Sequence, residues 1–171
     1  MILTALLLTM PVVSSDEKLG LEKLFVLGRN GICPISGEAP PGFSAMGRAD
    51  YYLTLPDGRR VPLKKQRERK AAVTIDTIRL TLPVGMTWQG LSVSGATVIT
   101  TAIDEGDTWE TYRLDFTSSK QAVTKALATA GHRLGPVGTR KFNDDEVVPY
   151  GATETIAERG AGSSLICTTD G

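Results

Sequence analysis

The sequence predicts an α+β domain: a mostly antiparallel sheet, one well-defined helix at about 118–130 packed on it, and a weaker N-terminal helix. Three observations support this prediction. Apolar and polar residues alternate through much of the chain between about 51 and 116. A single stretch after Phe116 has the 3.6-residue spacing of an amphipathic helix. Turn-forming residues separate several of the alternating segments by hairpin lengths.

The first part of the chain contains the weaker signals. Residues 16–28 are predicted to be helical, because four residues share the i, i+3, i+4, i+7 spacing of one helix face: Leu21, Leu24, Phe25 and Gly28. Gly20 weakens this helix. Residues 29–48 are predicted to form a loop, since six Gly or Pro lie between positions 30 and 42.

A hairpin is predicted next. Residues 51–55 form its first strand, and Pro56-Asp57-Gly58 supplies the start of a type I turn and a position for positive φ. Residues 59–63 return. Pro62 cannot donate a hydrogen bond to a neighbouring strand, so the returning strand is expected at a sheet edge.

The main strands follow the hairpin. Val73 and Ile75 alternate on one parity, and the next apolar residues alternate on the other: Ile78, Leu80 and Leu82. This phase change predicts a bulge or a turn at Asp76-Thr77. In the following segment five residues share one parity: Leu91, Val93, Thr97, Ile99 and Ile103. After a hairpin loop at 104–107, one strand face carries Tyr112, Leu114 and Phe116, and the other carries Arg113 and Asp115.

The clearest element is the helix at about 118–130. Ser118-x-x-Gln121 matches a capping box, and Gly131 is a natural residue to follow the helix end. Its apolar face is formed by Val123, Ala126, Leu127 and Ala130. Residues 132–151 are predicted to form a loop, in which 140–142 could be a short strand. Two final strands, 153–159 and 163–168, are predicted on either side of a turn at 160–162.

The N-terminus predicts export. Residues 1–15 are uncharged and largely apolar, and Val13-Ser14-Ser15 places short residues at the −3 and −1 positions of a cut before Asp16. This is the pattern of a signal peptide without its basic n-region, and the alternative is a buried N-terminal helix or strand. The stretch is shorter than the roughly 20 apolar residues of a spanning helix. We therefore expect a single domain, residues 16–171, in the periplasm or outside the cell, with no transmembrane segment after cleavage.

The cysteines agree with export. Cys33 and Cys167 are the only two, and an isolated pair in an exported domain most simply forms one disulfide. The alternative is a pair of free buried thiols. No CxxC motif is present, and no sequence pattern marks either cysteine as a nucleophile.

Composition and motifs exclude several classes of function. Nineteen Lys and Arg balance nineteen Asp and Glu, which argues against a dedicated nucleic-acid binder. One His and two Cys cannot build a His/Cys metal cage. The motifs of phosphate-binding loops, zincins and α/β-hydrolases are absent. The sequence therefore assigns no cofactor, no metal site and no catalytic residue.

Several residues have both a structural and a functional interpretation. His132 follows the helix end, so we expect a helix-capping or solvated side chain, with a general base as the alternative. The acidic stretches 104–107 and 144–146 are expected to be solvated turns, with calcium binding or a glycosidase pair as alternatives. Trp88 and Trp109 are expected in the core, with stacking on a sugar as the alternative.

Residues 59–70 form the strongest local charge cluster. It contains one carboxylate, Glu68, against seven cations: Arg59, Arg60, Lys64, Lys65, Arg67, Arg69 and Lys70. We expect this segment at the surface, as an anion-binding stripe for a polymer or membrane surface, or alternatively as a mobile loop whose charge prevents edge aggregation.

These patterns favour a non-enzymatic, exported binding or envelope-associated domain. Its partner would be an anionic envelope polymer or another protein, and nucleic acid is not expected. The alternatives are a small exported hydrolase with a carboxylate-based site and a structural envelope protein without a ligand. A flat sheet face with exposed apolar residues would favour the binding domain, whereas a cleft lined by converging acids and Trp109 would favour the enzyme.

Overall fold

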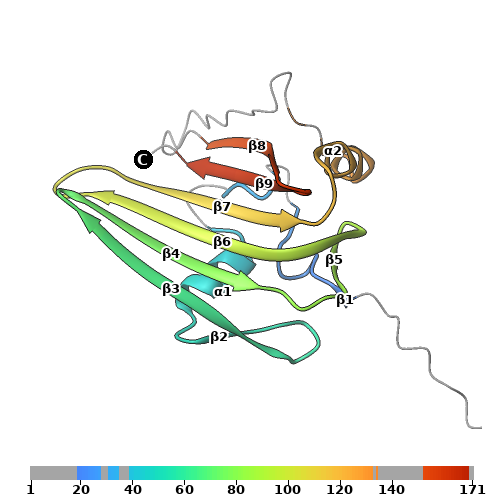
Figure 1. The fold of residues 1–171 in the computed structure, drawn as a ribbon, viewed down its shortest axis with the longest axis horizontal. Coiled ribbons are helices and arrows are strands. Elements are labelled where there is room, and N and C mark those ends of the chain that lie inside the picture. The colour runs from blue at the N-terminus through green and yellow to red at the C-terminus, as the bar shows by residue number, and fades with distance from the viewer. Residues whose placement is uncertain (1–18, 28–30, 35–38, 133, 135–151, 170–171) are drawn as a thin grey trace, which may run out of the picture.

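A twisted antiparallel sheet forms the centre of the computed structural model, which describes residues 19–27, 31–34, 39–132, 134 and 152–169. Its strands are β2 (Tyr52–Thr54), β3 (Arg60–Lys70), β4 (Val73–Thr81), β6 (Leu91–Ile103), β7 (Thr108–Phe116), β8 (Ala152–Arg159) and β9 (Gly162–Thr169). They lie in the order β2-β3-β4-β6-β7-β9-β8 (Figure 1). The short strands β1 (Leu19–Gly20) and β5 (Met86–Trp88) pair in parallel with each other, and β5 also pairs with β6. The mostly antiparallel sheet is as predicted.

The first hairpin is confirmed. Leu55 N donates to Arg59 O at 2.8 Å, and Gly58 adopts a φ of +84° in the turn between β2 and β3. β2 covers only the first residues of β3, with Tyr52 opposite Pro62. From Lys64 onward β3 is paired on one side only among the described residues, so Pro62 lies near the edge of the sheet, as expected.

The predicted bulge at Asp76-Thr77 is wrong. β4 pairs with β3 and with β6 in continuous register from Val73 to its end. The apolar residues change parity because the buried face changes along the strand. Ile78 and Leu80 point toward the core, whereas Val73 and Ile75 lie on the opposite face, where they are half-buried.

The bulge lies instead in β6. Its register against β7 shifts between Val93 and Gly95. Val93 is therefore buried together with Ala96 and Val98, although its parity in the sequence differs from theirs. The expectation that the apolar residues of this segment share one parity is wrong. Because of the bulge, Thr97 and Ile99 lie on the face opposite Val93.

Helix α2 (Lys120–Thr129) confirms the predicted helix. Ser119, rather than Ser118, is the N-cap, and its hydroxyl accepts a hydrogen bond from Ala122 N. The helix ends at Gly131, whose φ is +82°, and His132 N donates back to Leu127 O at 2.9 Å. Val123 and Leu127 are buried, as predicted.

The second, shorter helix is not where the sequence pattern placed it. Among residues 19–27 only a single turn forms, in which Leu21 O accepts from Leu24 N and Phe25 N. The helix is α1 (Pro41–Arg48), inside the segment predicted to be a loop. Pro41 sits in the first turn, where its missing N–H costs nothing, and Phe43 and Met46 form its buried face.

The core lies on one face of the sheet, which we call the inner face. Tyr112, Leu114 and Phe116 of β7 contribute to it, and all three are buried as predicted. α1 packs over this face, with the Phe43 and Tyr112 rings 5.1 Å apart, and Figure 1 shows α1 behind the sheet. Trp88 is fully buried there and donates its indole N–H to Phe25 O.

The predicted disulfide is present between Cys33 and Cys167, which are 134 residues apart. It ties the N-terminal segment to β9 on the inner face. The predicted signal peptide, the strand at 140–142 and the acidic stretch 144–146 lie outside the described residues. Within the described part of the chain, neither helix is long and apolar enough to cross a membrane.

Candidate functional site

The second face of the sheet, which we call the outer face, has no described helix packed on it. Residues directly opposite one another on paired strands share a face, so the register identifies its members. The row through β7 contains Trp109, Thr111, Arg113 and Asp115, the residues that alternate with the buried ones. α1 and α2 contribute their buried side chains to the core of the inner face. Among the described residues, this sheet face is therefore open to a ligand.

A row of basic side chains crosses the outer face. Lys64 is opposite Arg79, Arg79 is opposite Thr97, and Thr97 is opposite Arg113. These residues come from β3, β4, β6 and β7, so the row extends over about 14 Å at the usual strand spacing. We call Lys64, Arg79 and Arg113 the basic row. Lys64 and Arg79 are exposed, and Arg113 is partly buried.

Positive charge exceeds negative charge on this face, although the whole chain is neutral. By register the face holds six cations against two carboxylates: Arg60, Lys64, Lys70, Arg79, Arg113 and Arg159 against Glu68 and Asp115. The excess therefore results from how the strands sort the charges between the two faces.

An apolar and threonine-rich area lies beside the basic row, toward the hairpin ends of the strands. Ile75 is opposite Thr101, which is opposite Trp109, and Val73 is opposite Ile103. Trp109 is half-buried there and does not belong to the core, so the expectation of a core position is wrong for this tryptophan and correct for Trp88. An indole on an open sheet face offers a flat apolar surface to a ligand.

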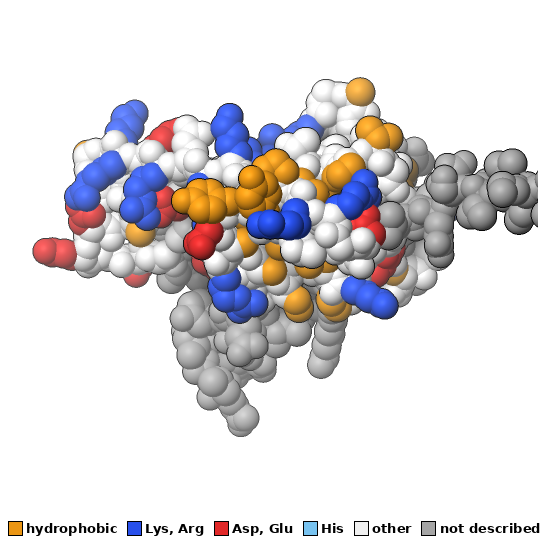
Figure 2. Space-filling view, turned by 90° about the horizontal axis from the view of Figure 1, so that it is seen from below, with side chains coloured by type: hydrophobic (Ala, Val, Ile, Leu, Met, Phe, Trp, Pro, Cys, Tyr) orange, Lys and Arg blue, Asp and Glu red, His pale blue; other side chains and the backbone are white. Residues whose placement is uncertain are grey.

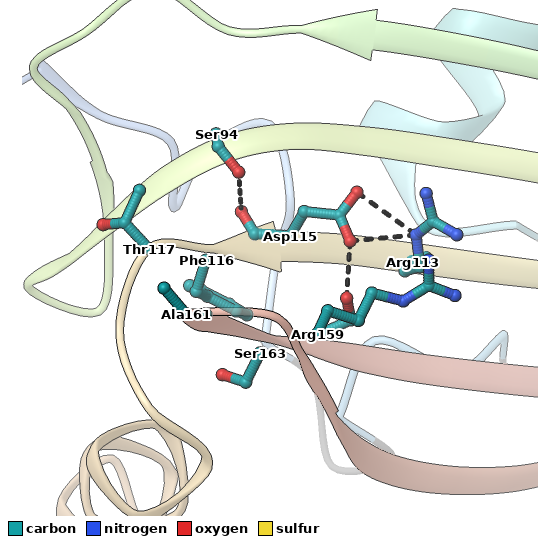
Figure 3. Close-up of a pocket in the computed structure, with 10 residues that line it drawn as sticks. Ser94, Arg113, Asp115, Phe116, Thr117, Arg159, Ala161 and Ser163 are labelled. Atoms are coloured by element: carbon teal, nitrogen blue, oxygen red, sulfur yellow. Dashed lines mark hydrogen bonds and ion pairs between the residues drawn. The ribbon is translucent and has the colours of Figure 1, made fainter.

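An open cleft of about 410 Å³ lies at the other end of the outer face. Figure 3 shows the residues around it, which come from β6, β7, β8 and β9, from the turn between β8 and β9, and from the position after β7. Its polar residues are Arg113, Asp115 and Arg159 together with the exposed Ser94 and Thr117 and the buried Ser163 and Ser164. Ala161, Gly162 and Phe116 form the rest.

One hydrogen-bond network organises this cleft. The Arg113 guanidinium pairs with Asp115, at 2.9 Å from Nε to Oδ1, and donates from Nη2 to Thr97 Oγ1 at 3.0 Å. Ser164 donates to Asp115 Oδ1 at 2.5 Å. Asp115 is the only carboxylate among the residues that line the cleft. The two converging acids expected of a carboxylate-based hydrolase are therefore not assembled in the described part of this cleft.

The basic segment 59–70 is an ordered strand, so the mobile-loop interpretation is wrong for it. Its side chains are largely exposed, as expected. Figure 2, which looks onto the β2–β3 side, shows Lys and Arg side chains spread along this edge. The alternation of β3 divides the cations between the two faces, so the seven do not form one stripe.

Four of the seven cations contact other side chains of the chain. Arg59 pairs with Asp57, and Arg60 lies 4.6 Å above the ring of Tyr52. Arg67 forms two hydrogen bonds to Asp76, of 2.6 and 2.7 Å, and Arg69 pairs with Asp104 at 2.7 Å. The Arg67 hydrogen bonds hold the pKa of the Asp76 carboxyl below its ordinary value. Lys64, Lys65 and Lys70 are in no ion pair within the described residues.

The side chain of His132 is not solvated, and it does not lie at the surface as a helix-capping cation. It is buried, and its Nε2 lies 2.5 Å from Oε2 of Glu154, a carboxylate with no exposed surface. Glu154 Oε1 accepts from Ile32 N at 2.9 Å. A Cβ atom at Gly31, whose φ is +67°, would collide with this carboxylate. The pair connects the end of α2, β8 and the N-terminal segment, which is a structural role.

The acidic residues of the β6–β7 hairpin are the candidates for a calcium site. Asp104 is occupied by Arg69, and Glu105 adopts a φ of +59° in the hairpin turn. No group of three or more His, Cys, Asp or Glu side chains that could hold a metal ion occurs among the residues that the structure describes.

The outer face could not have been found from local sequence patterns. Arg79, Arg113 and Arg159 come from three separate strands, and only the register brings them to one face. The one local signal was the apolar phase change in β4, which marks where Val73 and Ile75 turn outward. Comparisons of the chain with protein-family models, with curated proteins and with solved structures find no match.

Proposed function

We propose that the protein is an exported, non-enzymatic domain that binds an anionic polymer of the cell envelope on its outer face. The observation that carries this proposal is the basic row on a sheet face with no described covering element. Exposed cations attract a polyanion over about 8–10 Å at physiological salt. A row that spans four strands can contact several charges of one extended chain at the same time.

The polymer that fits this face best is an acidic polysaccharide. Trp109 and the threonines beside the basic row offer an aromatic face and hydroxyl groups, which suit sugar rings better than a bare phosphate chain. A second protein would need a larger apolar area than the scattered Val, Ile and Trp side chains supply, because a stable interface has an apolar core.

Export is supported by the disulfide between Cys33 and Cys167, since such bonds persist in oxidising compartments. Mass spectrometry of the protein from its host tests this part. A chain that starts near Asp16 supports export through the predicted signal peptide, whereas an intact Met1 in the cytosolic fraction contradicts it.

Affinity electrophoresis in gels that contain polygalacturonate, with neutral dextran as the reference polymer, tests the binding. We expect polygalacturonate alone to retard the protein, with the effect weakening as salt rises. The variant Lys64→Ser/Arg79→Ser removes two members of the basic row and should lose most of the retardation.

The matched control is Lys120→Ser/Lys125→Ser, which removes the same charge from the exposed side of α2. It should be retarded as strongly as the wild type. Equal retardation of both variants, or none of the wild type at low salt, would contradict the proposed function. Retention by a protein partner from the envelope fraction, but not by the polymer, would favour a protein-binding role.

A further inference from the structure

The chemistry of the cleft is more selective than that of the basic row. Arg159 lines the cleft, is exposed, and forms none of the ion pairs found among the described residues. A guanidinium carries five N–H donors in a planar fork that matches a carboxylate. This fork is therefore available to an anionic group at the cleft.

Arg113 supplies a second guanidinium whose position is fixed. Its Nε and one Nη2 hydrogen are used by Asp115 and Thr97, which leaves the Nη1 group free to donate. Figure 3 shows the side chains of Arg113 and Arg159 on the same side of the cleft. With Asp115 included, the cleft has one net positive charge, which suits a ligand with one negative charge.

The Ser94 hydroxyl complements a different part of the ligand. Ser94 is exposed and donates to Asp115 O at 3.2 Å, whereas Ser163 and Ser164 are buried and donate to Ser118 O and Asp115 Oδ1. Because the hydroxyl hydrogen of Ser94 is used within the protein, its oxygen can only accept a hydrogen bond from a ligand. Such an acceptor suits a sugar hydroxyl, and it does not suit a sulfate or phosphate, which carries acceptors only.

We infer that the cleft is a subsite for one sugar-acid unit, with its carboxylate bound by Arg159 and Arg113 and a hydroxyl directed at the Ser94 oxygen. This inference rests on the proposed function, because it assigns the cleft to one unit of the acidic polysaccharide on the outer face. The cleft volume of about 410 Å³ lies within the usual range of small-molecule sites, about 300–1,000 Å³. Ala161 and Gly162 leave the wall beside a sugar ring free of large side chains.

Calorimetric titration with methyl galacturonide tests the subsite, with methyl galactoside and inorganic sulfate as probes that lack the carboxylate and the hydroxyls. We expect the sugar acid to bind at least tenfold more tightly than either probe. Arg159→Gln should weaken its binding about tenfold or more, because a charge-assisted bidentate contact is lost. Arg159→Lys keeps the charge and loses the fork, so its affinity should lie between those of the wild type and Arg159→Gln.

Asp115→Asn should have the opposite effect. It removes the carboxylate that neutralises Arg113 and raises the net positive charge of the cleft, so the sugar acid should bind several-fold more tightly. Lys125→Gln, which changes the same amount of charge on α2, should leave the affinity unchanged. Melting curves of each variant establish whether it is folded. If Asp115→Asn does not fold, the affinity of Arg159→Gln for methyl galacturonide tests the subsite by itself.

Three results would overturn the subsite. These are an unchanged affinity in Arg159→Gln, weaker binding by Asp115→Asn in its folded state, or sulfate binding as tight as that of the sugar acid. The polymer assay separates this failure from that of the proposed function. If Arg159→Gln binds methyl galacturonide as the wild type does while Lys64→Ser/Arg79→Ser loses polygalacturonate, the subsite fails and the polymer-binding face stands. If the wild type binds the monomer and not the polymer, the proposed function fails and the subsite stands.

Discussion

Replacement of His132 by Ala should destabilise the protein strongly, although His132 is far from the outer face. The Glu154 carboxylate has no exposed surface and has two partners, His132 Nε2 at 2.5 Å and Ile32 N at 2.9 Å. His132→Ala removes one of them and leaves the carboxylate buried. Removing the partner of a buried polar group costs about 1–3 kcal/mol, and more where the group left behind is charged. Since domains are stable by only about 5–15 kcal/mol, this is a large part of the total.

The replacement Glu154→Gln separates this explanation from simple loss of packing. The amide keeps an oxygen that accepts from Ile32 N and nearly the same volume, but it carries no charge. We expect it to cost about 1–2 kcal/mol, well below the cost of His132→Ala. In the double variant His132→Ala/Glu154→Gln the buried charge is gone, so its cost should be less than the sum of the two single costs.

Urea denaturation followed by circular dichroism, with the disulfide intact, measures these free energies of unfolding. Lys125→Ala on the exposed side of α2 is the reference and should change stability by no more than about 0.5 kcal/mol. A cost for His132→Ala below about 1 kcal/mol would refute the argument, because it would mean that the buried Glu154 side chain does not depend on His132 as a partner. Additive costs in the double variant would refute the coupling.

Three further perturbations test the fold. Leu127→Ala should cost about 2–5 kcal/mol in urea denaturation because Leu127 is buried on α2, and a cost as small as that of Lys125→Ala would contradict the helix packing. Cys33→Ser/Cys167→Ser should lower stability by about 2–5 kcal/mol, and an unchanged urea midpoint would show that the disulfide does not constrain the chain. Asp76→Asn should lower the urea midpoint slightly at pH 7. Because Arg67 holds the pKa of Asp76 below its ordinary value, this difference should vanish well below pH 4. A difference that persists there would exclude the ion pair as its cause.

The elements that depend on neighbouring residues were predictable from the sequence. The turn at Pro56-Asp57-Gly58 and helix α2 each follow from a few residues whose backbone preferences and spacing point the same way. The short helix α1 was missed because its prolines and glycines are typical of a loop. Pro41 is nevertheless well suited to the first turn of a helix, and Phe43 and Met46 are stabilised there by burial rather than by helix propensity.

The candidate site was predictable only in part, because it depends on register. Lys64 belonged to the predicted anion-binding segment, but Arg67 and Arg69 of the same segment are paired with carboxylates. The other members of the basic row are contributed by strands far along the chain. His132 and Glu154 are 22 residues apart, and no spacing rule connects them. The phase change in β4 did carry information, since Val73 and Ile75 turn outward, but a bulge would produce the same pattern in the sequence.

The disulfide between Cys33 and Cys167 has a consequence for the order of events during synthesis. At about 5–20 residues per second, roughly 7 to 27 s separate the translation of the two cysteines, which are 134 residues apart. During that interval Cys33 has no cysteine of its own chain with which to react, because the sequence contains only these two. Any disulfide that it forms in that time joins it to another molecule. The bond that fastens the N-terminal segment to β9 therefore closes only after nearly the whole described chain has been synthesised.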